Sequence, residues 1–163
     1  MAKLSRDWSN QVVLLAEDND DEVVLFKRAY KRAGINHSLQ IVRDGEEAIA
    51  YLKGEGKFSN RRDHPFPILL LLDLQMPRKD GLQVLQWVRK QPLINRLRII
   101  VISGREDVEA ARMAYHLGAN LFLIKPVDSN VFIDQLKHIN AYWLNLSRAP
   151  DISSLNSGLI RAS

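Results

Sequence analysis

The chain has 163 residues, of which 46% are hydrophobic and 26% are charged, with a formal net charge of +4 at pH 7. This length and composition are typical of one globular domain with a sizeable core. Cysteine is absent, which excludes disulfides, thiolate metal sites and cysteine nucleophiles. Residues 1–10 contain no signal-peptide core, and no apolar run approaches the ~20 residues of a membrane span. We therefore expect a cytoplasmic location and no membrane partner.

The positive charge is distributed along the chain rather than gathered in one stretch. No recognition helix, zinc site or aromatic RNA-binding motif accompanies it, so we expect no nucleic-acid partner. The histidines are scattered without metal-ligand spacing, and we expect surface or boundary positions for them: His37, His64, His116 and His138.

The N-terminal region consists of a polar stretch and an apolar one. Residues 1–10 are polar, and we expect a flexible N-terminal arm there. Residues 12–16 are apolar and lead directly into Glu17 and Asp18. A short apolar run bounded by polar residues is typical of a strand buried on both faces, as in parallel sheets. We therefore expect two carboxylates at the carboxyl end of the first strand.

A helix follows, which Asn19 or Asp20 can cap. It carries a basic cluster, which the plain interpretation assigns to a solvated face: Lys27, Arg28, Lys31 and Arg32. Residues 39–43 alternate in polarity, which is typical of a strand near a sheet edge, and residues 46–53 favour a second helix. The connection over residues 54–67 is long and polar, and its residues indicate no chemistry.

The central apolar run, residues 68–72, leads directly into Asp73. Asp73 therefore belongs at the carboxyl end of a buried strand, the edge at which open α/β sheets bind ligands. Pro77 and Gly81 shape the loop that follows. A lone aspartate at this place would most simply cap the next helix. Asp73 is not alone, because the first strand also ends in carboxylates.

The second half of the chain repeats this pattern. We expect two pairs of elements: helix 81–90 with strand 98–102, and helix 106–117 with strand 121–124. The first of these strands leads into Ser103, and the second leads into Lys125. A hydroxyl and an ammonium group are therefore expected at the same sheet edge as the carboxylates.

The last helix, capped by Asp128 or Ser129, has an apolar stripe at helical spacing: Phe132, Leu136, Ile139, Trp143 and Leu146. The first three members are expected to face the core, whereas Trp143 packs either onto its own domain or against a partner. We expect one domain over residues 11–148, with an extended last helix, and a disordered tail over residues 149–163.

The carboxyl ends of neighbouring parallel strands lie at one edge of a sheet, which would bring together five side chains: Glu17, Asp18, Asp73, Ser103 and Lys125. Like charges at short range favour a bound cation, and an all-oxygen cluster suits Mg²⁺ when a phosphate joins the site. A phosphoryl group on Asp73 would be surrounded by Mg²⁺, the Lys125 ammonium and the Ser103 hydroxyl. These groups suit a carboxylate nucleophile that attacks phosphorus.

The chain resembles the receiver domains of two-component response regulators. The resemblance rests on motifs in a fixed order, each at a strand end: Glu17-Asp18, Asp73 with Met76-Pro77 and Gly81, Ser103-Gly104 and Lys125-Pro126. It covers roughly residues 10–140. It implies an α/β fold of the flavodoxin-like type, with a five-stranded parallel sheet flanked by five helices in a three-layer sandwich. It also implies a signalling phosphoacceptor rather than an enzyme.

The resemblance implies roles for seven residues: Asp73 as phosphoacceptor, Glu17, Asp18, Asp73 and the Gln75 backbone carbonyl as Mg²⁺ ligands, Lys125 as the phosphate-binding lysine, and Ser103 and Phe122 as the switch pair. Two of them depart from the commonest pattern of the family. Glu17 is one methylene longer than the more frequent aspartate, which shifts the Mg²⁺ geometry. Phe122 lacks the hydroxyl of the frequent tyrosine, so it would switch by burial alone.

The resemblance also implies a sensor histidine kinase as the partner, on which receivers dock partly through their first helix; the basic cluster there would help to steer association. Residues 142–144, followed by Pro150, resemble the ending of stand-alone regulators that pair with bacterial and cyanobacterial phytochrome kinases. We therefore expect switching and homodimer formation on the surface of the fourth helix, the fifth strand and the last helix with its extension. No DNA-binding output domain is expected.

Three other functions are open to residues of these types. A phosphatase of the haloacid dehalogenase type needs a second aspartate two residues after the nucleophile, where this chain has Gln75. A Schiff-base aldolase needs an uncharged lysine, whereas nearby carboxylates would keep Lys125 charged. A pseudo-receiver, which acts as a phosphorylation-independent interaction module, would not need the complete set of acids, hydroxyl and lysine.

Overall fold

The computed structural model of the protein describes residues 11–76 and 78–146. Five parallel strands form one sheet in the order β2-β1-β3-β4-β5. The strands are β1 (Val12–Ala16), β2 (Ser38–Val42), β3 (Leu69–Asp73), β4 (Arg98–Ser103) and β5 (Leu121–Ile124). The helices of the described part are α1 (Asp20–Arg32), α2 (Gly45–Lys53), α3 (Gly81–Lys90), α4 (Val108–His116) and α5 (Ser129–Ile139), with a 3₁₀ helix η2 (Gly56–Phe58) and a π-helix η3 (Asn140–Leu146).

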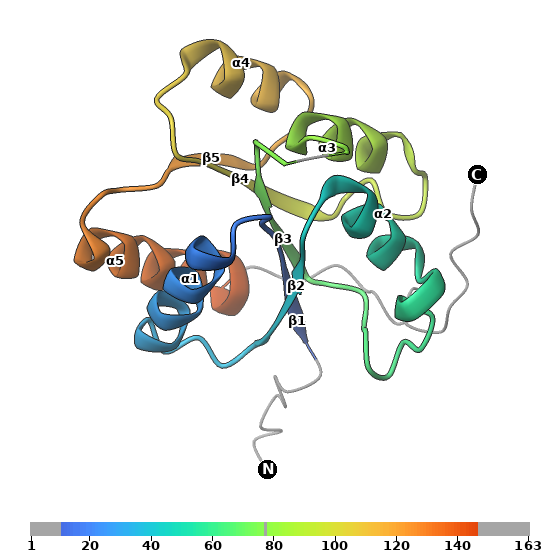
Figure 1. Cartoon of the computed structure of the whole chain (residues 1–163), viewed down its shortest axis with the longest axis horizontal. Helices are drawn as coiled ribbons and strands as arrows, with labels where there is room; N and C mark the ends of the chain where they lie inside the picture. Colours follow the sequence, from blue (N-terminus) through green and yellow to red (C-terminus); the bar gives the residue numbers. More distant parts are fainter. Residues whose placement is uncertain (1–10, 77, 147–163) are drawn as a thin grey trace.

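The helices form two layers, one on each face of the sheet (Figure 1). α1 packs against α5 on one face, and α3 contacts both α2 and α4 on the other. A separate hydrophobic core fills each space, and β1 contributes to both. Leu14 and Ala16 face the core of α2, α3 and α4, whereas Val13 and Leu15 face the core of α1 and α5. The predicted flavodoxin-like fold, with a five-stranded parallel sheet in three layers, is therefore confirmed.

Side chains at the helix starts fix where two of the helices begin. The Asn19 side-chain oxygen accepts a hydrogen bond from the Glu22 backbone N–H at 3.0 Å, so Asn19 rather than Asp20 caps α1. α4 is shorter than the predicted helix over 106–117. Its first turn is capped by Asp107, whose carboxylate accepts from a backbone N–H of that turn at 3.1 Å.

The last helix changes its geometry near its end. α5, which Asp128 caps, is followed by the π-helix η3 rather than by more α-helix. Because a π-helix has more residues per turn, the apolar position after Ile139 that enters the core is Leu144 and not Trp143. Trp143 is partly buried against its own domain, and its carbonyl accepts a hydrogen bond from Arg98 at 3.0 Å.

Some predictions concern residues outside the described ranges. The N-terminal arm over 1–10 and the tail over 149–163 fall there, as do Pro77 and the side chain of Leu146. The domain boundaries therefore stay predictions. Within residues 11–76 and 78–146, no helix has the length and apolar character that would let it cross a membrane.

The long connection over residues 54–67 is tied to α2 by Arg61. The buried guanidinium donates hydrogen bonds to the carbonyls of Tyr51 and Leu52, both at 2.7 Å, and of His64 at 3.1 Å. The last carbonyls of a helix lack partners within that helix, and Arg61 supplies donors to them. This connection therefore has a structural role that its composition does not indicate.

A second arginine, Arg89 in the last turn of α3, joins three segments. Its guanidinium donates to the Gly118 carbonyl at 3.0 and 2.8 Å, to the Leu97 carbonyl at 2.6 Å, and to the Asn120 side-chain oxygen at 3.1 Å. Arg89 thus links the end of α3 to the start of β4 and to the loop before β5.

We expect Arg89→Lys to lower the free energy of unfolding by about 2–4 kcal/mol, because an ammonium group cannot reach all of these acceptors and leaves partly buried carbonyls unsatisfied. Urea denaturation would measure the loss. Arg112→Lys is the matched control, since Arg112 forms an exposed pair with Glu109 at 3.4 Å and should cost less than about 0.5 kcal/mol. Equal losses in both variants would contradict this role of Arg89.

Candidate functional site

Three carboxylates meet where β1 and β3 end. These strands are neighbours, and Ala16 is paired with Leu72, so the residues that follow in each strand lie side by side. Carboxylate oxygens of Glu17, Asp18 and Asp73 all lie within 4.8 Å of one another. Glu17 is only 3% exposed, whereas Asp18 is exposed. The structure therefore brings the predicted acids together at the predicted edge of the sheet.

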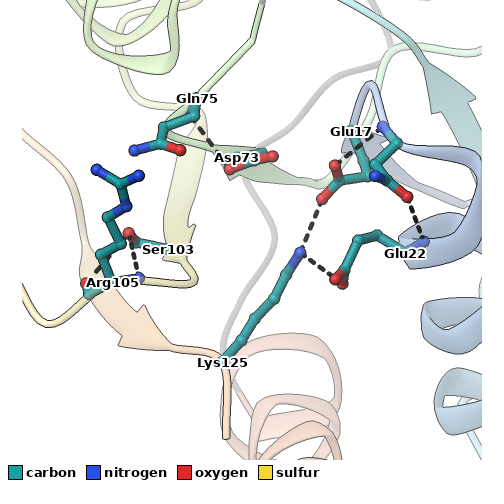
Figure 2. A network of polar contacts seen from close by, with 8 residues as sticks. Glu17, Glu22, Asp73, Gln75, Ser103, Arg105 and Lys125 are labelled. Carbon is teal, nitrogen blue, oxygen red and sulfur yellow. Dashed lines mark hydrogen bonds and ion pairs between the residues drawn. The ribbon is translucent and has the colours of Figure 1, made fainter. Parts of the chain in front are cut away.

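Lys125 joins this cluster from the end of β5. Its Nζ lies 2.8 Å from a Glu17 carboxylate oxygen and 3.1 Å from a Glu22 carboxylate oxygen (Figure 2). The Lys125 backbone N–H donates to the Ser103 carbonyl at 2.8 Å, which fixes this strand end beside β4. Glu22 was not among the predicted site residues. The sequence signal that could have indicated Glu22 is its place in the first turn of the helix that follows the acid pair.

Burial and the neighbouring charges together set the electrostatics of the site. Burial disfavours the charged form of Asp73, the Glu17 charge repels it, and together they raise the pKa of Asp73 to about 7. Burial also acts against ionised Glu17, but the hydrogen bond and charge of Lys125 outweigh it and lower the Glu17 pKa. Burial alone would lower the pKa of Lys125, and the contacts with Glu17 and Glu22 raise it instead.

The acidic cluster fits a hard divalent cation. Its donors are carboxylate oxygens of Glu17, Asp18 and Asp73, the ligand type that Mg²⁺ and Mn²⁺ prefer. Burial and the Glu17 charge raise the Asp73 pKa, and two positive charges at this place would favour the ionised carboxylate. The residues present therefore suit the predicted cofactor.

The described residues of the loop after Asp73 contact its neighbours. The Gln75 N–H donates to a carboxylate oxygen of Asp73 at 3.2 Å (Figure 2). A Cβ atom at Gly81 would lie 2.5 Å from the Asp73 carbonyl oxygen, so only glycine fits there. Arg78, with a left-handed φ of 66°, pairs at 2.8 Å with Asp44, the capping residue of α2. The loop that carries Gln75 is thereby fixed to both α2 and α3.

The two predicted switch residues lie farther along the sheet. Ser103 is 2% exposed, and its hydroxyl donates to the Arg105 carbonyl and accepts from the Arg105 N–H, both at 3.2 Å (Figure 2). Phe122 of β5 is half-buried against the core of α3 and α4, and its backbone N–H donates to the Tyr115 hydroxyl at 3.1 Å. The Ser103 hydroxyl is thus bonded within its own loop, beside the acidic cluster.

A cavity of about 480 Å³ opens at the cluster. Glu17, Asp73 and Lys125 are among its lining residues, together with Phe26 of α1 and Phe132 of α5. Asp73 therefore borders a cavity between the sheet and the α1–α5 layer.

Comparison with known proteins identifies the family of the chain. The family model for the response regulator receiver domain matches residues 13–137. Response regulator Rcp1 of Synechocystis sp. is 32% identical over 146 residues, which cover 88% of this chain and 97% of Rcp1. The structure of Rcp1 in its Mn²⁺-bound form has a TM-score of 0.76 and 31% identity, and the alignment covers 86% of this chain and 99% of that one.

Two further solved structures are similar. The response regulator RPA3017, described in red light signaling of R. palustris, has a TM-score of 0.82 and 33% identity, with 86% of this chain and 98% of that chain covered. The phosphorylated cyanobacterial phytochrome response regulator RcpA has a TM-score of 0.78 and 31% identity, with the same coverage of 86% and 98%. The fold, the acidic edge of the sheet and these matches together show that the chain belongs to the response regulator receiver domain family.

Proposed function

We propose that this response regulator accepts a phosphoryl group on Asp73 from the phosphohistidine of a sensor histidine kinase. The observation that carries the proposal is the arrangement at one sheet edge, where Asp73 lies among the carboxylates of Glu17 and Asp18, with Lys125 beside them. The similarity to RcpA, whose structure is described as phosphorylated, supports it.

The transfer would exchange one phosphorus bond for another. An Asp73 carboxylate oxygen forms the new P–O bond while the P–N bond of the phosphohistidine breaks, and the imidazole leaves with the electron pair and takes up a proton. The Lys125 ammonium, a compact point charge, stabilises the charge on the phosphoryl oxygens. The product is an acyl phosphate. Because water hydrolyses it, its lifetime would limit how long the phosphorylated state lasts.

Mg²⁺ is the proposed cofactor. Its ligands would be Asp18, Asp73 and the Gln75 backbone carbonyl, with Glu17 acting through a water molecule. When bound, the ion supplies positive charge that neutralises phosphoryl oxygens. The carboxylate donor set supports this assignment, as does the Mn²⁺-bound structure of the relative Rcp1.

The proposed output is a change in the surface of α4, β5 and α5. Phosphoryl oxygens on Asp73 would accept a hydrogen bond from Ser103, which would exchange its contacts with Arg105 for this new one. Movement of that loop would leave space into which Phe122 turns. Such a local electrostatic change biases a two-state element.

The proposed partners are a phytochrome-type histidine kinase and a second copy of the chain. The kinase partner is proposed from the similarity to RPA3017 and RcpA. Because such a kinase takes its phosphoryl group from ATP, we propose a cytoplasmic location.

The dimer is proposed from exposed apolar side chains of α4 and β5, which would be covered in it: Val108, Met113, Tyr115 and Ile124.

Phosphorylation of Asp73 is tested directly with a small donor. Wild-type protein incubated with acetyl phosphate and Mg²⁺ should gain one phosphoryl group by intact mass, and Asp73→Asn should gain none, because the amide is not a nucleophile for phosphorus. Treatment with a histidine kinase loaded with phosphate is the second arm. No gain from either donor, together with no detectable Mg²⁺ binding, would favour the pseudo-receiver instead.

The metal site is tested through stability. The pKa of Asp73 is about 7 in the folded protein against an ordinary value of 3.8, so ionised Asp73 destabilises the fold as pH rises between these values. In EDTA at pH 8, we expect the free energy of unfolding of Asp73→Asn to exceed that of the wild type by about 1–3 kcal/mol. This difference should vanish below about pH 4, where Asp73 is protonated in both the folded and the unfolded wild type.

Addition of Mg²⁺ should raise the stability of the wild type by about 1.4–2.7 kcal/mol at 10 to 100 times the dissociation constant, and that of Asp73→Asn by clearly less. Glu106→Gln, which changes an exposed carboxylate outside the cluster, is the control and should respond to Mg²⁺ as the wild type does. A wild type whose denaturation is unchanged by millimolar Mg²⁺ would contradict the metal assignment.

The dimer is tested by sedimentation velocity with and without phosphorylation. Phosphorylated wild type should sediment as a dimer at lower concentration than the unmodified protein. Met113→Glu, on the exposed side of α4, should abolish this shift while phosphorylation persists. Leu93→Glu is the control, since Leu93 is exposed in the loop before β4. The same oligomer in every sample would rule out the phosphorylation-dependent dimer.

A further inference from the structure

Glu22 is a carboxylate at the site that the phosphoacceptor chemistry described above does not use. It belongs to the first turn of α1, where its backbone N–H is held by Asn19 at 3.0 Å. Its side chain reaches Lys125 with a contact of 3.1 Å between a carboxylate oxygen and Nζ. Glu22 and Lys125 both line the cavity that opens at Asp73.

Lys125 divides its hydrogen bonds between two partners. Figure 2 shows its ammonium group between the Glu17 and Glu22 carboxylates, at 2.8 and 3.1 Å. These contacts connect the end of β5 to the end of β1 and to the first turn of α1. The same ammonium group is the proposed counter-ion of the phosphoryl group on Asp73, so the phosphoryl oxygens and the two carboxylates compete for it.

The two carboxylates differ in how easily they can release the lysine. The Glu17 side chain is 4% exposed, and a charge left there without its cation would be costly. The Glu22 side chain is 44% exposed, so water can solvate its charge at small cost when the contact breaks. Glu22 is therefore the partner that Lys125 gives up first.

We propose that Glu22 is a latch that holds Lys125 toward α1 in the unphosphorylated protein and releases it when a phosphoryl group occupies Asp73. This inference rests on the proposed phosphoacceptor function. The contact between Glu22 and Lys125 stabilises the unphosphorylated state alone, so it raises the threshold for phosphorylation. By reciprocity, phosphorylation frees the first turn of α1 from β5, which transmits the state of Asp73 to that helix.

The test compares Glu22→Gln with Asp21→Asn. Both variants remove one negative charge from the same helical turn, and Asp21 is exposed and is not among the residues that line the cavity. Each protein is incubated with acetyl phosphate and Mg²⁺, and the phosphorylated fraction is measured by intact mass. We expect Glu22→Gln to raise the ratio of phosphorylated to unphosphorylated protein about three- to tenfold over Asp21→Asn.

A second measurement addresses the resting state. A double-mutant cycle of Glu22→Gln and Lys125→Met, followed by urea denaturation, should show coupling in the unphosphorylated protein, and beryllofluoride with Mg²⁺ should abolish that coupling. Phosphorylation of Glu22→Gln equal to that of Asp21→Asn, or below it, would overturn the latch while leaving the phosphoacceptor function intact. A wild type that gains no phosphoryl group and binds no beryllofluoride would overturn both.

Discussion

The mutual repulsion of carboxylates at the ends of β1 and β3 is the constraint on which the site depends. The apolar strands β1 and β3 bring these carboxylates together because they pair side by side. Burying each large aliphatic side chain of the two strands stabilises the fold by about 1.5–3 kcal/mol. A pKa of about 7 at Asp73 costs a few kcal/mol at most, at about 1.4 kcal/mol per pH unit. Strand burial therefore outweighs the repulsion, and the fold can keep a cluster that attracts cations and favours proton or metal binding.

The two sides of Asp73 differ in their contacts. Arg78 and Gly81 fix the loop after Asp73 to α2 and α3, through an ion pair and a backbone approach too close for a side chain. The opposite wall is formed by Lys125 and the partly exposed Glu22, whose contact can exchange with water. In the proposed transfer, Asp73 at the end of β3 would face an ammonium group whose partner Glu22 is partly exposed, so the phosphoryl group could be accepted with little rearrangement of the β3 backbone.

Sequence reasoning predicted the sheet and most of the site because both follow from short-range patterns. Apolar runs such as 68–72 are buried strands, and a polar residue directly after such a run must lie at the sheet edge, as Asp73 does. The contact of Glu22 with Lys125 joins residues 103 positions apart, and no periodic pattern encodes it. Leu144 was missed for a different reason, since the stripe was counted at α-helical spacing, whereas the π-helix brings Leu144 into the core.

The packing of the helices indicates which part of the domain can respond to Asp73. The Lys125 N–H holds β5 to the Ser103 carbonyl, so a turn of the Ser103 hydroxyl leaves the strand backbone in place. α4 buries only Ala114 among its nine residues, whereas α1 and α3 each bury four. Displacing α4 therefore exposes little apolar surface and costs less than displacing either of the others. This low cost supports the proposed output, in which the loop after β4 and α4 would move and Phe122 would rotate.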